Sequence, residues 1–122
     1  MTTLDYFAGF EGESELTVSR RNVKGIVCSR LKMWIGYFDE IVSLINPNDH
    51  GKWEGVLLEY HQHTGWYEQK LWKCRDVPLF IDQLLSIDNQ KLTPRAKSVW
   101  EELIELLKVS VENKEEIWFK YF

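Results

Sequence analysis

The feature that most constrains the fold is a set of helical repeats, and residues 93–113 hold the clearest of them. Thr93 and Pro94 suit the start of a helix, because a hydroxyl can accept an early N–H group and proline has none to leave unpaired. Apolar residues then recur in steps of three and four, at Ala96, Val99, Trp100, Leu103, Leu107 and Val111. The pattern therefore predicts a helix that ends near Asn113.

The same spacing predicts three more helices, over about residues 19–45, 52–63 and 76–88. Asp76 is a suitable cap for the last of them, with Pro78 in its first turn. Gly25 and Gly36 fall inside the first helix, where each costs about 1 kcal/mol relative to Ala. Gly36 either lets a neighbouring helix approach closely or marks a kink.

Strands are expected only at the ends of the chain and in one short segment. Residues 116–122 alternate between two sets of side chains, which predicts a terminal strand. A lone strand is not stable, so it needs a partner, either the N-terminal arm (residues 1–18) or the segment 66–74. The expected fold is α+β and predominantly α, a bundle of about four helices with this short strand, in a single domain over residues 1–122.

Composition narrows the classes of function. The net charge of −4 disfavours nucleic acid as a direct partner, since phosphate binding needs a basic field. The longest apolar run, Val56 to Leu58, is far too short for a membrane span. The first residues show no basic and apolar signal segment, so we expect a cytoplasmic protein with Cys28 and Cys74 reduced and buried.

No catalytic constellation is visible in the sequence. None of the serines lies in a GxSxG elbow, and no glycine-rich phosphate loop is present. His61 and His63 are two residues apart, which on a helix points their side chains about 200° apart, so a shared metal ion is not expected. We therefore expect no enzyme activity, no metal site and no cofactor.

Residues 53–72 are rich in rings, holding three of the six tryptophans, two of the five tyrosines and two of the three histidines. Trp34, Trp53 and Trp100 lie on inward faces of predicted helices and are expected in the core. Trp66, Tyr67 and Trp72 follow the turn at Gly65, where a ring either fills the core under a loop or anchors a partner. The same region is acidic, with six acids and one base between residues 39 and 68.

An acidic surface with embedded rings suits a basic protein partner, because complementary fields steer association. An ordinary solvated face is the alternative reading of the same charges. The candidate partner-binding residues are Asp39, Glu40, Glu54, Glu59, His61, Trp66, Tyr67 and Glu68.

The sequence also resembles a known class of protein. Residues 60–67 read YHQHTGWY and are followed by Trp72, a helix that starts near Pro78 and contains residues 80–84 (FIDQL), the long capped helix and the terminal strand. This order resembles small bacterial immunity proteins of polymorphic toxin systems, in particular those of contact-dependent growth inhibition. The resemblance covers roughly residues 50–122.

The resemblance implies a cytoplasmic protein that binds and inhibits the toxin domain of a neighbouring cell's exoprotein, with a nuclease as one candidate toxin. We expect the protein to be a monomer or a weak homodimer. Two alternatives remain open from the residues alone. One is a non-catalytic adaptor or self-associating structural module that docks through the aromatic loop. The other is a small hydrolase that uses His61 and a nearby acid.

Overall fold

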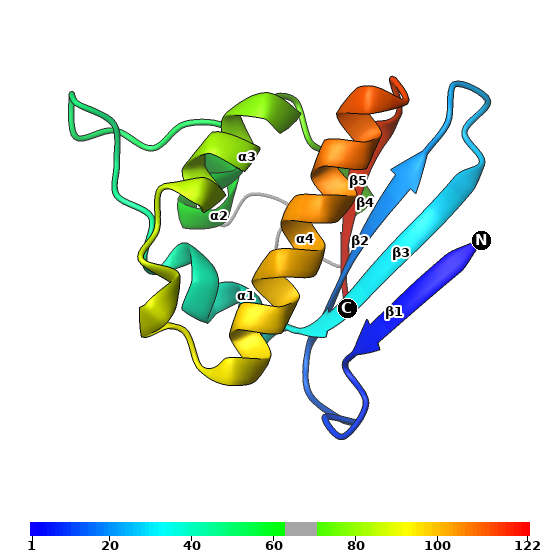
Figure 1. Cartoon of the computed structure of the whole chain (residues 1–122), viewed down its shortest axis with the longest axis horizontal. Helices are drawn as coiled ribbons and strands as arrows, with labels where there is room; N and C mark the ends of the chain where they lie inside the picture. The colour runs from blue at the N-terminus through cyan, green and yellow to red at the C-terminus, as the bar shows by residue number, and fades with distance from the viewer. Residues whose placement is uncertain (63–70) are drawn as a thin grey trace.

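A computed structural model of the chain describes residues 1–62 and 71–122 (Figure 1). In chain order its elements are β1 (Thr2–Tyr6), β2 (Glu15–Arg21), β3 (Val27–Trp34), α1 (Ile35–Val42), α2 (Val56–Gln62), β4 (Leu71–Lys73), α3 (Val77–Leu85), the 3₁₀ turn η1 (Asn89–Lys91), α4 (Pro94–Glu112) and β5 (Glu116–Tyr121).

The strands form one five-stranded mixed sheet in the order β1-β3-β2-β5-β4. β1 runs parallel to β3, and the other neighbours are antiparallel. The helices gather on one side of this sheet, with α4 crossing in front of its central strands in the view of Figure 1. The architecture is therefore a single layer of helices on a single sheet.

The prediction of a predominantly α-helical bundle is wrong, and the error lies mainly in residues 19–45. That stretch holds the end of β2, a hairpin, β3 and only then the short helix α1. Val23 and Ile26, which seemed to belong to a helical stripe, are 89% and 58% exposed. In β3 it is Ser29, Leu31 and Met33 that are buried, a spacing of two that marks a strand.

The hairpin between β2 and β3 has its own local cause. The side chain of Asn22 accepts hydrogen bonds from the backbone N–H groups of Lys24 and Ile26, at 2.9 and 3.0 Å. Gly25 adopts a φ of 78°, which glycine tolerates and most residues do not. The glycine that is costly inside a helix is therefore the residue that the turn requires.

Helices after residue 50 follow the prediction more closely. Asp76 caps α3 by accepting from the N–H of Leu79 at 3.0 Å. Thr93 and Asn113 flank α4 as expected, but the Thr93 hydroxyl does not accept a hydrogen bond from an N–H group of the helix. α2 starts only at Val56, after Gly55, so it is shorter than predicted.

The terminal strand is confirmed, and it has two partners. β5 pairs with β4, which lies in the expected segment 66–74. β5 also pairs with β2, whose residues come partly from the predicted N-terminal arm (1–18) and partly from the predicted first helix (19–45). The N-terminal residues, expected as an extended arm or short strand, contribute β1 at the far edge of the sheet.

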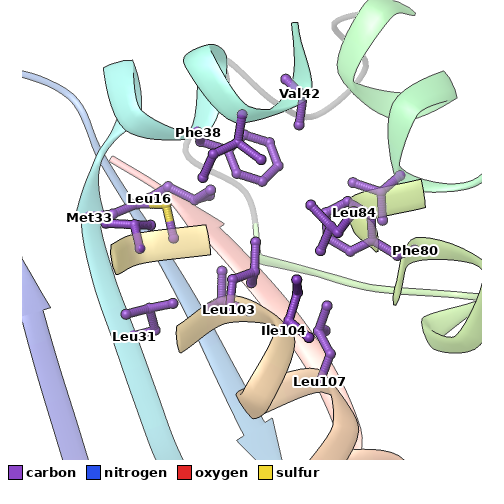
Figure 2. Close-up of a cluster of buried hydrophobic side chains, with 14 of the residues drawn as sticks. Leu16, Leu31, Met33, Phe38, Val42, Phe80, Leu84, Leu103, Ile104 and Leu107 are labelled. Carbon is purple, nitrogen blue, oxygen red and sulfur yellow. The ribbon is translucent and has the colours of Figure 1, made fainter. Parts of the chain in front are cut away.

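The core lies between the helices and the inward face of the sheet. Figure 2 shows Leu16, Leu31 and Met33 of the sheet facing three groups of helical side chains: Leu103, Ile104 and Leu107 of α4, Phe38 and Val42 of α1, and Phe80 and Leu84 of α3. Phe38, Phe80 and Phe119 are fully buried, with ring centroids 6.1–6.5 Å apart. These contacts fix the helices on this side of the sheet.

The three tryptophans expected in the core are half-buried and pack against its edge. Trp34 stacks on Phe10, with ring centroids 4.5 Å apart. Trp100 donates its indole N–H to the carbonyl oxygen of Leu84 at 2.9 Å, which ties α4 to the end of α3. Trp53 stacks on His61, with centroids 4.0 Å apart.

Candidate functional site

The outward face of the sheet is a surface that no helix of the described residues covers. Side chains alternate between the two faces of a strand, and helices α1 and α4 pack on the inward face through buried residues such as Phe38 and Leu103. The opposite face carries the other half of each strand. On β2 these outward residues are Glu15, Thr17, Ser19 and Arg21.

A trough of about 320 Å³ runs along this face. Its floor is made of the short side chains Thr17 and Ser19 on the central strand β2. One wall comes from Arg30 and Lys32 on β3, and the other from β5, β4 and the C-terminus. The full lining is Glu15, Thr17, Ser19, Arg21, Val27, Arg30, Lys32, Leu71, Lys120 and Phe122. The trough exists because two small residues lie between rows of long ones.

Strand register places the charges of this face in rows. In one row Lys32, Thr17 and Lys120 lie side by side on β3, β2 and β5, with Asp5 beyond them on β1. In the next row Arg30 lies beside Ser19 and Trp118. The basic side chains of the face thus flank the trough on both sides.

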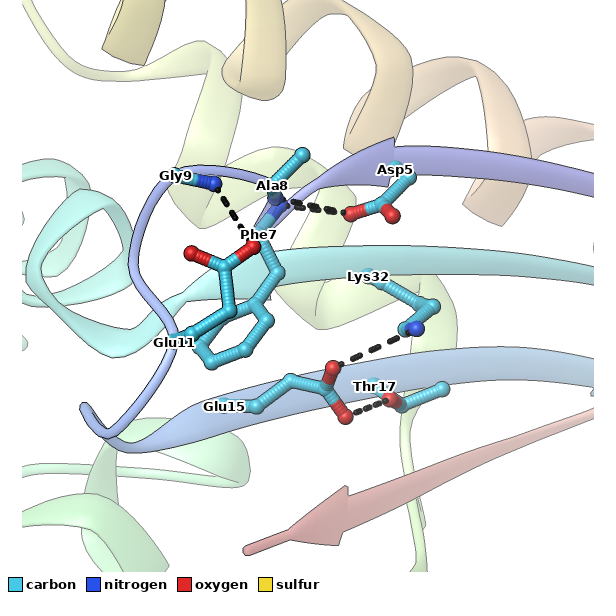
Figure 3. A network of polar contacts seen from close by, with 8 residues as sticks. All are labelled: Asp5, Phe7, Ala8, Gly9, Glu11, Glu15, Thr17 and Lys32. Atoms are coloured by element: carbon cyan, nitrogen blue, oxygen red, sulfur yellow. Dashed lines mark hydrogen bonds and ion pairs between the residues drawn. The ribbon is translucent and has the colours of Figure 1, made fainter.

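Carboxylates are interspersed among these bases. Glu15 forms an ion pair with Lys32 at 3.5 Å and accepts a hydrogen bond from Thr17 at 3.2 Å, as Figure 3 shows. Glu116 pairs with Lys73 at 2.6 Å. Hydrogen bonds from Lys73 and Trp118 lower the pKa of Glu116, so it stays ionised. The face is therefore mixed in charge, with an excess of bases.

Asp5 is held by its own loop. Its carboxylate accepts from the N–H groups of Phe7 and Ala8 at 2.7 and 3.1 Å (Figure 3). Glu11 closes the same loop by accepting from Gly9, and backbone hydrogen bonds lower its pKa. These hydrogen bonds of Asp5 and Glu11 organise the turn after β1.

Two arginines of the trough have unused hydrogen-bonding capacity. Arg30 makes no side-chain hydrogen bond or ion pair within the described part of the chain, although it is half-buried. The Arg21 guanidinium lies over the Trp118 ring, 4.9 Å from its centroid. The Arg21 Nε is buried and has no hydrogen-bond partner among the described residues. The guanidinium of Arg30 is suited to a carboxylate brought by a ligand.

The trough ends in an apolar rim. Phe122 and Leu71 are 46% and 42% exposed and lie beside Lys120. The Lys120 ammonium stands 4.8 Å from the Phe122 ring centroid. This end of the trough therefore offers both a charge and an apolar surface.

Two of the acidic residues predicted to bind a partner make hydrogen bonds within the protein. Glu40 is engaged at the start of α4, where it accepts from the backbone N–H and the hydroxyl of Thr93 at 2.7 and 3.1 Å. The Asp39 carboxylate accepts a hydrogen bond from the hydroxyl group of Tyr60. Both carboxylates thus hold neighbouring elements together within the protein.

The other predicted site residues that the structure describes lie on α2 or just before it. Glu54 is exposed just before α2, and Glu59 is half-buried on α2. Glu59 lines a smaller cavity of about 140 Å³ together with Lys73 and Arg75. His61 is exposed and stacks on Trp53. Trp66, Tyr67 and Glu68 lie outside the described residues.

The cysteines are free, and their surroundings disfavour the thiolate. Cys74 is buried as expected, and burial raises its pKa to about 11. Cys28 is only half-buried, because it lies on a strand instead of a helix. A hydrogen bond to Glu115 raises the pKa of the Cys28 thiol. Neither group is set up as a nucleophile.

Among residues 1–62 and 71–122, no group of three His, Cys, Asp or Glu side chains could hold a metal ion. None of the helices within the same residues is both long and apolar enough to span a bilayer.

Sequence reasoning missed the basic residues of the trough, although two signals were present. Arg20, Arg21, Lys24, Arg30 and Lys32 form a block without acids, but the block fitted the start of a helix equally well. In residues 29–34 bases alternate with apolar residues, which is the strand pattern. Lys120 was already on the outward set of the predicted terminal strand, but its neighbours across the sheet could not be known.

No protein-family model, curated protein or solved structure matches this chain. Its function therefore has to be argued from the residues themselves.

Proposed function

We propose that this chain is a toxin-neutralising immunity protein that binds and inhibits a cognate toxin domain in the cytoplasm, without catalysing a reaction. In this proposal the outward face of the sheet is the surface that contacts the toxin domain. The observation that carries the proposal is the trough along β2, with Arg30 and Lys120 on its walls and Phe122 at its rim.

The composition of this face supports a protein partner over nucleic acid. Glu15 and Glu116 lie among the bases and form ion pairs with Lys32 and Lys73, so the face presents both signs of charge. The whole protein carries a net charge of −4, which opposes the approach of a polyanion at long range. A folded protein, in contrast, presents both signs of charge and apolar groups, which this face could match.

The resemblance of residues 50–122 to immunity proteins supports a toxin domain as the particular partner. The acidic residues first considered for contact are less suitable, because Asp39 and Glu40 are used inside the protein. The proposal therefore keeps the class of function and assigns the contact surface to the sheet.

Co-expression tests the proposal. The probe is the C-terminal toxin domain of the exoprotein encoded next to this chain, produced in a bacterium from an inducible promoter. We expect growth to continue when the chain is co-expressed, and the two proteins to elute together from a sizing column. Growth arrest that persists, with both proteins eluting separately, would contradict the proposal.

A self-associating structural module is the second candidate, because β1 is an edge strand whose first four residues are exposed. An exposed edge presents unpaired backbone groups to another chain. Sedimentation of the purified protein over a range of concentrations separates the two candidates. A stable dimer that does not bind the toxin domain would favour the module.

A further inference from the structure

The shape of the trough indicates what part of a partner it accepts. β2 has seven residues, so at about 3.3 Å per residue the strand and the trough above it extend over about 20 Å. The floor is flat and polar because Thr17 and Ser19 are short. A groove that is long, straight and shallow fits an extended segment better than a helix or a compact ligand.

The spacing of the bases indicates the chemistry of that segment. Arg30 and Lys32 are two residues apart on one strand, so their side chains leave the same face about 7 Å apart. Alternate side chains of an extended segment have the same repeat. Lys120 stands on the opposite wall, about 10 Å from Lys32 across β2, because neighbouring strands are about 4.8 Å apart. Carboxylates at alternate positions of a bound segment could therefore contact bases from both walls.

Arg30 and Lys120 on the walls are available for such contacts, whereas Lys32 is already paired with Glu15. Arg30 has no acidic partner among the described residues, and an arginine binds a carboxylate through two parallel hydrogen bonds. At one end of the trough Phe122 and Leu71 provide an apolar contact for a residue next to the acidic ones.

We propose that the trough along β2 binds an extended segment of the partner protein that carries Asp or Glu at alternate positions. The inference rests on the proposed function, because it names the part of the toxin domain that the sheet face accepts. Its specific content is the charge complementarity between the walls, mainly Arg30, Lys32 and Lys120, and the carboxylates of the segment.

Nuclear magnetic resonance titration of the full chain tests the inference directly. The probe is a synthetic peptide, long enough to span β2, in which Glu alternates with Thr. We expect amide shifts at Thr17, Ser19 and Lys120 that weaken as salt is added, because exposed charge pairs are screened. The same peptide with Gln in place of Glu should bind at least about tenfold more weakly, since it lacks the charges.

Reversing the charge of two bases tests whether the peptide binds in the trough. The double variant Arg30→Glu with Lys120→Glu reverses one base on each wall and should abolish the shifts. The matched control is Lys97→Glu with Lys108→Glu, which makes the same change of net charge at exposed positions of α4 on the other side of the sheet. If the first variant does not fold, Arg30→Gln with Lys120→Gln replaces it, and circular dichroism confirms the fold.

Several outcomes would overturn the inference. Shifts confined to residues outside the trough would do so, as would equal loss of binding in the control variant. Tighter binding of an oligouridylate of the same length than of the Glu peptide would show that the face recognises phosphates.

Failure of the inference is distinguishable from failure of the proposed function. If the trough variant binds the toxin domain as tightly as the unaltered protein, the inference is wrong and the immunity function remains. If the Glu peptide binds in the trough but the toxin domain forms no complex, the proposed function is wrong instead.

Discussion

Replacing Glu40 by Ala tests whether this carboxylate stabilises the fold or binds a partner, as its acidity suggested. Glu40 lies on α1, and Thr93 immediately precedes α4. The two residues are 53 positions apart, yet both carboxylate oxygens accept hydrogen bonds from Thr93. The Thr93 hydroxyl makes no capping bond to its own helix, so Glu40 supplies the acceptor at this helix end.

The expected loss of stability follows from these contacts. Removing a capping acceptor costs about 0.5–2 kcal/mol, and a negative charge at a helix N-terminus contributes about 0.3–1 kcal/mol more. Since Glu40 is partly solvated, we expect a loss of about 1–2 kcal/mol. For 122 residues the unfolding entropy near the midpoint is about 0.26 kcal/mol/K, at about 2.1 cal/mol/K per residue. The melting temperature should therefore fall by about 4–8 °C.

Thermal unfolding followed by circular dichroism measures this shift. Glu40→Gln keeps an oxygen for the Thr93 N–H but loses the charge, so it should fall between the Ala variant and the unaltered protein. The matched control is Glu101→Ala, an exposed acid on α4 with no hydrogen bond or ion pair within the described residues, which should change stability by less than about 0.5 kcal/mol. An unchanged melting temperature for Glu40→Ala, together with loss of the toxin complex, would refute the reasoning and return Glu40 to the binding surface.

Two further substitutions test the packing and the pH dependence. A methyl group added by Gly36→Ala would overlap the Trp34 indole. The free energy of unfolding, measured with denaturant, should fall by about 1–3 kcal/mol, and Trp34 fluorescence should change. An unchanged denaturation midpoint would contradict the overlap. Burial raises the pKa of Cys74 from near 9 to about 11. Between pH 9 and pH 11 the native thiol therefore keeps a proton that the unfolded chain loses. The free energy of unfolding should fall by about 2–3 kcal/mol over that range. The variant Cys74→Ala should lack this part of the decline in unfolding free energy from pH 8 to 11, and an identical decline would show that other groups cause it.

The predictions from sequence succeeded where the signal was local. Asp76 with Pro78 defines the start of α3 through groups within one turn of the chain, and Pro94 marks the start of α4 in the same way. The Thr93 hydroxyl, expected to cap α4, donates to Glu40 instead. The alternation of residues 116–121 likewise identified β5. These features need no knowledge of distant residues.

Residues 19–45 show where local reasoning failed. Leu31, Trp34, Ile35 and Phe38 have the spacing of a helix even though the chain changes from strand to helix at Ile35. Leu31 is buried by strand alternation and Phe38 by helical packing, so two different periods combined into one apparent repeat. Only the long-range pairing of β3 with both β1 and β2 shows where the strand ends and the helix begins.

The candidate site depends even more strongly on tertiary contacts. By itself the sequence determined the helix caps, the terminal strand and the presence of a basic block, because each of these depends on neighbouring residues. The tertiary structure decided that Lys32 and Lys120, 88 positions apart, flank Thr17 in one row of the sheet. It also decided that the Glu40 carboxylate accepts a hydrogen bond from Thr93. Strand order and register bring such residues together, and they result from burial of the whole inward face and not from any single segment.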